Sequence, residues 1–219
     1  HRAWNGHTKG TAPGYDVYSK WNMGSATTNN WWNRDILPGE IGCTTSHIQV
    51  WERIVEEGLE KTLILEDDFD PNANIGILEE PSSYYDIAYL GRTKIDKNAT
   101  ETSMGGSWVT PSVSYCTHAY VITLEGAKKL LNNYKLKQNL IPADEFLAAT
   151  YTKHMRPDIN ALFPPTLTAV ATARQDFIGQ KRPQSESTIE TDPTKNPNLM
   201  KDQNETKNII EEQPYFEIL

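Results

Sequence analysis

Residues 63–68 read LILEDD, three aliphatic side chains followed directly by three carboxylates. Residues 63–65 have the composition of a strand that is buried on both faces, whereas residues 66–68 would repel one another unless a positive charge lay between them. A strand that ends where its sheet opens on a crevice meets both needs, because ligands of open α/β sheets bind just outside the carboxyl ends of the strands. The stretch therefore predicts an α/β sheet with a ligand site at the end of this strand.

The acidic half of this stretch suits a hard divalent cation. Mn²⁺ and Mg²⁺ prefer carboxylate oxygens and keep positions free for substrate phosphates. Asp68 is the first candidate for a metal ligand, with Glu66 and Asp67 beside it. Asp70 either adds an Asp-x-x-Asp spacing with Asp67 or is a turn residue. Acidic residues after a strand are also common in surface turns, so a solvated loop is the alternative for the triplet taken alone.

Composition limits the function classes. The chain has 219 residues, of which 37% are hydrophobic and 10% aromatic, enough for a substantial core. Its net charge of −8 argues against a nucleic-acid partner, which would need a positive surface. No stretch reaches the ~18 apolar residues of a membrane span. We assign residues 1–180 to one domain and residues 181–219 to a polar tail whose composition does not favour order.

Strand and helix signals alternate along the chain, which favours an α/β sheet. Two cysteines, Cys43 and Cys116, fall in segments that read as buried, which favours reduced thiols. The stretch through Gly105-Gly106 reads as a mobile loop. The expected elements are a helix from Thr44 or Thr45 to Gly58, a strand at 63–65, a strand at 87–90, a strand from 118 followed by a helix capped by Thr123, and a helix that begins near Pro142.

Four segments of the chain carry a recognisable pattern. They are GEIGCTTSHIQVWERIVEEGLEKTLILEDDF at 39–69, YDIAYLGR at 85–92, AYVITLEGAKKLL at 119–131 and IPADEFLAATYTKH at 141–154. Together they resemble glycosyltransferase family 25, which includes bacterial lipooligosaccharide glycosyltransferases and collagen hydroxylysine galactosyltransferases. The resemblance covers roughly residues 38–170, and DEFLAATYTKH is more similar to the collagen-modifying branch.

The resemblance implies a Rossmann-like, A-type glycosyltransferase fold with a mostly parallel central sheet. It also implies a UDP-sugar donor held by Mn²⁺ or Mg²⁺, with residues 66–68 in place of the family's Asp-x-Asp motif. The implied reaction moves galactose or glucose to a hydroxyl group, with inversion of the anomeric centre. The implied acceptor is a collagen-type hydroxylysine peptide or a glycan.

The resemblance also suggests roles for residues outside the acidic triplet. Asp144 is the preferred catalytic base and Glu145 the second choice, with helix capping as the alternative for both. His47 either touches the donor or is held by a capping hydrogen bond. Arg92 either contacts the diphosphate or pairs with the acidic triplet.

The chain departs from the family pattern in two places. The family's first strand and its arginine-bearing turn have no match here, and either lie outside this chain or have been replaced. The histidine that follows the last core strand in collagen-type members is absent from ATARQDFIGQKRP at 171–183, where Arg174, Asp176 and Lys181 are the candidate substitutes. A catalytically silent nucleotide-sugar or glycan-binding module is therefore the main rival. A metal-dependent phosphohydrolase is less favoured because no second carboxylate or histidine cluster accompanies the triplet.

Three tryptophans and a glycine pair have two readings each. Trp31, Trp32 and Trp108 either stack on sugar or base rings or serve as packing anchors. Gly105-Gly106 either hinges a lid that excludes water or forms a surface turn.

Overall fold

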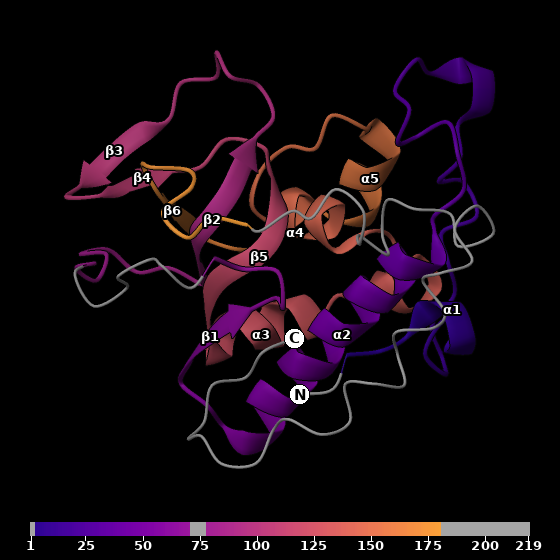
Figure 1. Ribbon diagram of the computed structural model, residues 1–219, viewed down its shortest axis with the longest axis horizontal. Coiled ribbons are helices and arrows are strands. Elements are labelled where there is room, and N and C mark those ends of the chain that lie inside the picture. Colours follow the sequence, from indigo (N-terminus) through magenta and orange to yellow (C-terminus); the bar gives the residue numbers. More distant parts are fainter. Residues whose placement is uncertain (1–2, 71–77, 181–219) are drawn as a thin grey trace.

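The computed structural model describes residues 3–70 and 78–180, so the polar tail predicted at 181–219 lies outside the described residues. The described chain is mixed α/β, as the alternating pattern predicts, with a six-stranded sheet in the order β1-β5-β2-β6-β4-β3 (Figure 1). The elements are α1 (Gly6–Lys9), η1 (Gly24–Ala26), α2 (Pro38–Glu57), β1 (Lys61–Leu65), β2 (Ile87–Lys94), β3 (Thr102–Gly105), β4 (Trp108–Thr110), β5 (Ser114–Thr123), α3 (Leu124–Leu131), η3 (Tyr134–Gln138), α4 (Ala143–Tyr151), α5 (Pro157–Leu162) and β6 (Ala169–Thr172).

The expectation of a mostly parallel sheet is wrong. Among the described strands only β2 and β6 pair in parallel, while β5 lies antiparallel between β1 and β2, and β4 is antiparallel to both β3 and β6. A parallel neighbour needs a crossover connection, usually a helix, and none lies between β2 and β5. β1, β2 and β6 nevertheless point the same way, so their carboxyl ends share one edge region.

The segment read as a mobile loop contains a β-hairpin. β3 and β4 pair from Thr102 opposite Thr110 to Gly105 opposite Trp108. Gly105 and Gly106 have φ angles of 92° and 56°, values that glycine adopts without steric cost. The glycine pair therefore makes the tight turn of this hairpin.

Helix α2 starts six residues before the predicted position. Pro38 occupies its first turn, where a missing N–H costs nothing, and the Glu40 carboxylate accepts the N–H of Leu37 at 2.7 Å. Arg34 pairs with the same carboxylate at 2.7 Å. The helix ends at Gly58, as predicted, in the left-handed conformation with φ 67°. Thr123 caps α3 as predicted by accepting the N–H of Gly126.

The central strands of the sheet, β2, β5 and β6, are largely buried on both faces. In Figure 1, α2, α4 and α5 lie to one side of the strands, and the larger core cluster on that side includes Trp51, Tyr89, Tyr120 and Phe146. A smaller cluster on the other face includes Leu90, which follows Tyr89 in β2 and so points the opposite way. The near-continuous apolar composition of the strands follows from this double burial.

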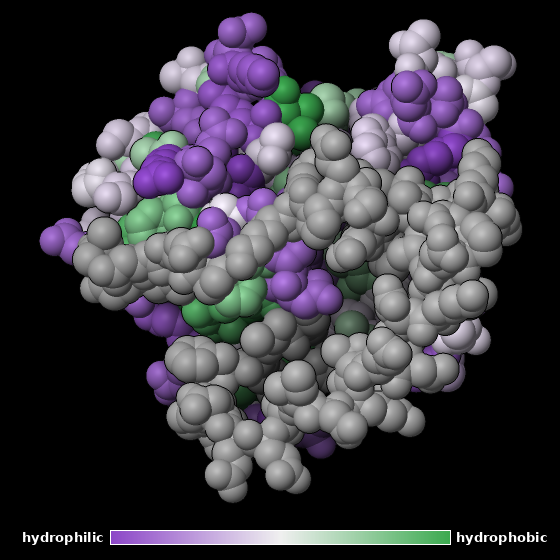
Figure 2. Space-filling view, in the orientation of Figure 1, coloured by the Kyte–Doolittle hydropathy of each residue, from purple (hydrophilic) through white to green (hydrophobic). Residues whose placement is uncertain are grey.

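Figure 2 shows the visible face hollowed at its upper edge, between the segment that joins β2 to β3 and the segment around η1. No helix in the described part of the chain is long and apolar enough to cross a membrane. Both cysteines, Cys43 and Cys116, are free thiols, as expected.

A glycine in β2 sets how closely the chain can pack beside the acidic turn. A Cβ atom on Gly91 would lie 2.1 Å from Nε2 of His118 and 2.4 Å from the carbonyl oxygen of Ile178. We expect Gly91→Ala to lower the free energy of unfolding by about 1–3 kcal/mol, the usual cost of overpacking, in a urea titration. Gly179→Ala is the matched control: its Cβ would make an ordinary 3.5 Å contact with Asp70, so its cost should stay within about 0.5 kcal/mol. Equal stabilities for the two variants would contradict the assigned packing.

Candidate functional site

The acidic turn, residues 66–70, leaves the sheet at the end of β1. The N–H of Glu66 donates to the carbonyl oxygen of His118 on β5 at 3.0 Å, just beyond the paired register. Ile64 and Leu65 are buried, whereas Asp67 is exposed. The change from apolar strand to open carboxylates lies where the sequence places it.

The Glu66 side chain turns inward and is held by α2 and β5. Its Oε1 lies 3.1 Å from Nε2 of His47 and also accepts the hydroxyl of Thr117. Nδ1 of His47 lies 2.9 Å from the hydroxyl of Tyr120, whose oxygen accepts the indole N–H of Trp51 at 3.0 Å. In the tautomer with its hydrogen on Nε2, His47 donates to Glu66 and accepts the Tyr120 hydroxyl at Nδ1.

These contacts decide the ionisation of Glu66. Burial acts to raise its pKa, but the hydrogen bonds from His47 and Thr117 help to outweigh burial, and the pKa is lowered from its ordinary value. Glu66 is therefore a carboxylate at neutral pH. His47 lies within α2 rather than at its cap, and its Nε2 faces Glu66, which corrects the capping alternative.

A bulge in β5 places two of these side chains. β5 shifts register against β2 around residues 116–118, and Cys116 is the only non-glycine residue in the described chain with a positive φ, 74°. Bulges redirect side chains at the edges of sites. Thr117 faces Glu66, whereas Nε2 of His118 lies 2.9 Å from the carbonyl oxygen of Ile178.

Asp67 and Asp68 are crowded carboxylates. Burial and the charge of Glu66 raise the pKa of both. Oδ2 of Asp68 accepts the side-chain N–H of Gln180 at 2.7 Å, while its Oδ1 is buried without a hydrogen-bond partner in the described residues. An unpaired buried carboxylate oxygen beside two further carboxylates fits a hard divalent cation, which prefers oxygen ligands.

The segment after β6 runs beside the acidic turn. The N–H of Asp70 donates to the carbonyl oxygen of Gly179 at 2.8 Å. Of the candidate substitutes for the family histidine, Arg174 and Asp176 form an exposed ion pair with each other at 2.9 Å, and Lys181 lies outside the described residues. Asp70 thus joins the turn to this segment through its backbone.

Glu145, at the start of α4, is held at both carboxylate oxygens. Its Oε1 accepts the indole N–H of Trp32 at 3.0 Å, and its Oε2 bonds Nε2 of His154. Nδ1 of His154 accepts the N–H of Arg156 at 3.0 Å, which leaves Nε2–H to donate to Glu145. With only 4% of its surface exposed, Glu145 is an anchored structural carboxylate.

Asp144 has different surroundings from its neighbour. Among the described residues, its carboxylate accepts one hydrogen bond, from the N–H of Glu145 to Oδ1, at 2.9 Å. Burial, and then the charge of Glu145, raise its pKa to about 7, with smaller contributions from Glu40 and Glu66. Asp144 therefore exchanges a proton near neutral pH, and it lies within electrostatic reach of the acidic turn.

Arg92 has a partner other than the acidic turn. Its guanidinium makes two parallel bonds to Glu101, at 2.7 and 2.8 Å, and a third to the hydroxyl of Ser114 at 2.9 Å. The side chain is fully buried. Of the two alternatives for Arg92, the ion pair with the acidic turn is not formed, because Glu101 supplies the opposite charge.

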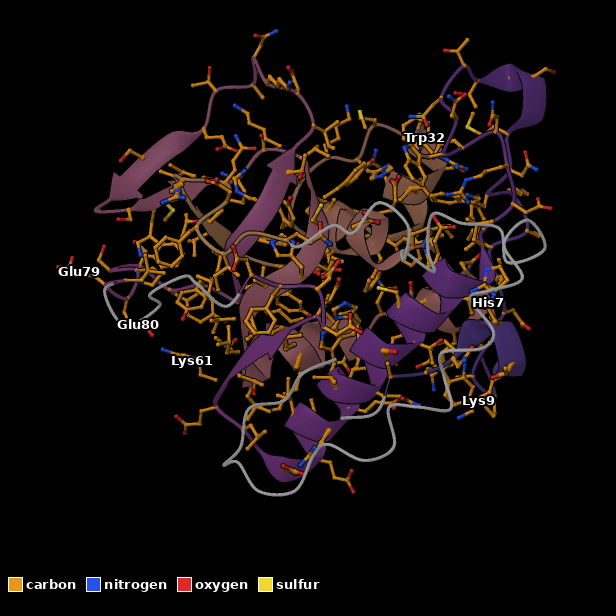
Figure 3. The ribbon with its side chains drawn as sticks, viewed as in Figure 1. His7, Lys9, Trp32, Lys61, Glu79 and Glu80 are labelled. Atoms are coloured by element: carbon orange, nitrogen blue, oxygen red, sulfur yellow. The ribbon has the colours of Figure 1, made fainter. Side chains whose placement is uncertain are left out.

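The three tryptophans differ in exposure. Trp108 is 5% exposed and donates its indole N–H to the carbonyl oxygen of Glu79, as a packing anchor does. Trp31 is 47% exposed. Trp32, labelled in Figure 3, belongs to the irregular N-terminal segment, and its indole N–H is donated to Glu145 on α4.

Several residues of this site carried a weaker sequence signal. Cys43 lies one helical turn before His47, a spacing that places both side chains on one helix face. Thr117 and His118 lie within β5, before its apolar second half, and His154 ends the family-like segment. Their partners are distant in sequence, so no local pattern announces them.

The sequence matches the model of a known protein family. The model of glycosyltransferase family 25, described as an LPS biosynthesis protein family, matches residues 18–147. The chain belongs to glycosyltransferase family 25. The match spans α2, the acidic turn and the start of α4, so it includes the principal groups of the site.

The chain spans only part of the length of its relatives within family 25. The chain is 36% identical over 141 residues to procollagen galactosyltransferase 1 of Danio rerio, and 39% identical over 139 residues to a glycosyltransferase 25 family member of Drosophila pseudoobscura pseudoobscura. It is 35% identical over 142 residues to the inactive glycosyltransferase 25 family member 3 of Homo sapiens. Each match covers 60% of this chain and 22–24% of the relative, so the aligned part spans about a quarter of those proteins.

Removing the charge of each of the two adjacent carboxylates of α4 should change the stability of the protein in opposite directions. Glu145→Gln places an amide against two N–H donors, so we expect it to lower the free energy of unfolding by about 1–3 kcal/mol. Asp144→Asn keeps an acceptor for the N–H of Glu145 and removes a charge that burial disfavours. We expect that variant to be at least as stable as the wild type at pH 8, as measured by urea unfolding.

The direction of this stability change follows from the linkage between proton binding and folding. The pKa of Asp144 is raised from 3.8 to about 7, so the folded state holds its proton more tightly than the unfolded chain. Its contribution is most favourable below pH 4 and is lost as pH rises through about 7. Any excess in the free energy of unfolding of Asp144→Asn over the wild type should therefore shrink as the pH falls from 8 to 4. Equal losses for both variants at pH 8 would contradict these assignments.

Proposed function

We propose that this chain transfers a hexose, galactose or glucose, from a UDP-sugar to a hydroxyl acceptor with the help of a divalent cation at the acidic turn. The observation that carries the proposal is the acidic turn of a family 25 chain, where Oδ1 of Asp68 is buried without a hydrogen-bond partner in the described residues. The pKa of Asp144, about 7, suits a general base at neutral pH, and the electrostatic influence of Glu66 on Asp144 indicates that the base is near the acidic turn.

Asp144, rather than Glu145, is the base of this proposal. Glu145 already accepts from Trp32 and His154, so taking a further proton would break buried hydrogen bonds. Asp144 accepts the proton of the acceptor hydroxyl. The hydroxyl oxygen then attacks the anomeric carbon as the bond from that carbon to the diphosphate oxygen breaks, and the anomeric centre inverts.

The acidic turn holds the cation and the donor. Asp68 supplies the unpaired Oδ1, and Asp67 a second, exposed carboxylate. Glu66 contributes its charge, since His47 and Thr117 occupy Oε1. Bound Mn²⁺ or Mg²⁺ would neutralise the negative charge that develops on the departing diphosphate.

The acceptor is a hydroxylysine-bearing peptide or a glycan in this proposal. The name of the Danio rerio relative, a procollagen galactosyltransferase, supports the peptide. The family description as an LPS biosynthesis protein supports the glycan. We further propose that residues 1–180 form one domain of the A-type glycosyltransferase fold, with strands of the common direction ending at the donor site.

A silent nucleotide-sugar or glycan-binding module is the second candidate. The observation that favours it is the 35% identity to a human family member named inactive. Such a module would keep the acidic turn and lose turnover.

Replacement of Asp144 tests the proposed base. We expect Asp144→Asn to lower acceptor-dependent UDP release by ~10²–10⁴-fold while it spares UDP-sugar binding, because a base acts on the acceptor. The activity of the wild type should increase as pH rises through about 7, and the variant should not show this increase. A near-normal variant with the wild-type pH profile would exclude Asp144 as the base.

Replacement of Asp68 tests the donor site. We expect Mn²⁺ and UDP to bind cooperatively, since crowded carboxylates gain most when the cation and the diphosphate are both present. Asp68→Asn should weaken that coupling and leave the circular dichroism spectrum unchanged. Calorimetry measures UDP affinity with and without Mn²⁺. An affinity that is independent of Mn²⁺ in both proteins would remove the metal from the proposal. Coupled binding without turnover in the wild type would support the silent module.

A further inference from the structure

A second group of ligand atoms lies on the α2 side of the acidic turn. Sγ of Cys43, Nε2 of His47 and a carboxylate oxygen of Glu66 all lie within 4.8 Å of one another. Oε1 of Glu66 is 3.1 Å from Nε2 of His47 and 4.0 Å from Sγ of Cys43. Cys43 and His47 are one helical turn apart on α2, so they present both ligand atoms from one face.

We propose that Cys43, His47 and Glu66 form a binding site for a thiophilic divalent cation of the zinc class. A set of one sulfur, one nitrogen and one oxygen suits Zn²⁺, whereas Mn²⁺ and Mg²⁺ prefer oxygen ligands alone. Three protein ligands leave the fourth tetrahedral position open to water or another ligand. This site is distinct from the hard-cation site proposed at Asp67 and Asp68.

The site is nearly preformed. Ligand bonds of ~2.0–2.3 Å to one tetrahedral centre place the ligand atoms roughly 3.3–3.8 Å apart. The observed separations therefore need only small side-chain adjustments. His47 is 1% exposed, and Tyr120 contacts its other ring nitrogen at 2.9 Å, the kind of partner that orients a metal-binding imidazole.

Protons balance without a further reactant. A bound cation would use the Nε2 lone pair of His47, so the ring hydrogen would lie on Nδ1 and be donated to the oxygen of Tyr120, while the hydroxyl hydrogen of Tyr120 would rotate away from Nδ1. That oxygen can still accept from Trp51, because it has two lone pairs. The Cys43 thiol releases one proton to solvent as its sulfur binds the cation.

The surrounding charge favours a cation. Glu66, Asp144 and Asp68 all act electrostatically on the Cys43 thiol. Three carboxylates around a thiolate would repel it, and a divalent cation relieves that repulsion.

Cobalt spectroscopy of the full chain tests the site. After treatment with a chelator, titration with Co²⁺ should produce a thiolate-to-metal charge-transfer band in the near ultraviolet, and Zn²⁺ should abolish it by displacement. Cys116→Ser, the matched control, should keep the band, because Cys116 lies on β5 with its sulfur against Thr93. Cys43→Ser should lose the band and weaken Zn²⁺ binding by at least ~10–100-fold, the cost of losing even an outer partner of a metal ligand.

Asp68→Asn separates this site from the donor site. It should keep the cobalt band while it weakens the coupling of Mn²⁺ to UDP. Absence of the band in the folded wild type, its survival in Cys43→Ser, or its loss in Cys116→Ser or Asp68→Asn would overturn the proposal. Circular dichroism of each variant confirms that a lost band is not a lost fold. None of these readouts requires glycosyl transfer, so failure of the proposed function would leave the result intact.

Discussion

The hydrogen bonds that hold Glu66 join three elements at one point. Glu66 begins the turn after β1, His47 comes from the middle of α2, and Thr117 comes from the bulge of β5. A buried carboxylate without such donors would be costly, so the positions of all three elements depend on one another. Because Trp51 and Tyr120 fix the other side of His47, the constraint reaches the hydrophobic core.

Asp144 and Glu145, adjacent at the start of α4, differ in their chemical behaviour because their surroundings differ. Both sit in the first turn, where the helix dipole favours negative charge. Within the part of the chain that the structure describes, Glu145 has donors at both oxygens, whereas Asp144 has a single backbone donor. Burial and the charge of its neighbour then dominate, which is why the pKa of Asp144 is raised to about 7. One carboxylate thereby stabilises the site, while its neighbour is available for proton transfer.

The irregular N-terminal segment is tied to the same region by Arg156. Its guanidinium donates to the carbonyl oxygen of Trp21 at 2.7 Å and lies 5.0 Å from the ring of Trp21 and 5.8 Å from that of Trp32. Trp32 in turn donates to Glu145. A segment with little regular structure is therefore fixed by buried polar contacts, and it packs beside α4.

The sequence by itself determined the strand at 63–65, the end of α2 at Gly58, the cap at Thr123 and the acidic turn, because each rests on neighbouring residues whose local preferences agree. Only the tertiary structure decided the antiparallel course of β5, the pairing of Arg92 with Glu101, and the unequal surroundings of Asp144 and Glu145. Strand direction depends on whether a connection crosses the sheet. Ion pairing and pKa depend on which distant groups burial brings together, information that no single segment carries.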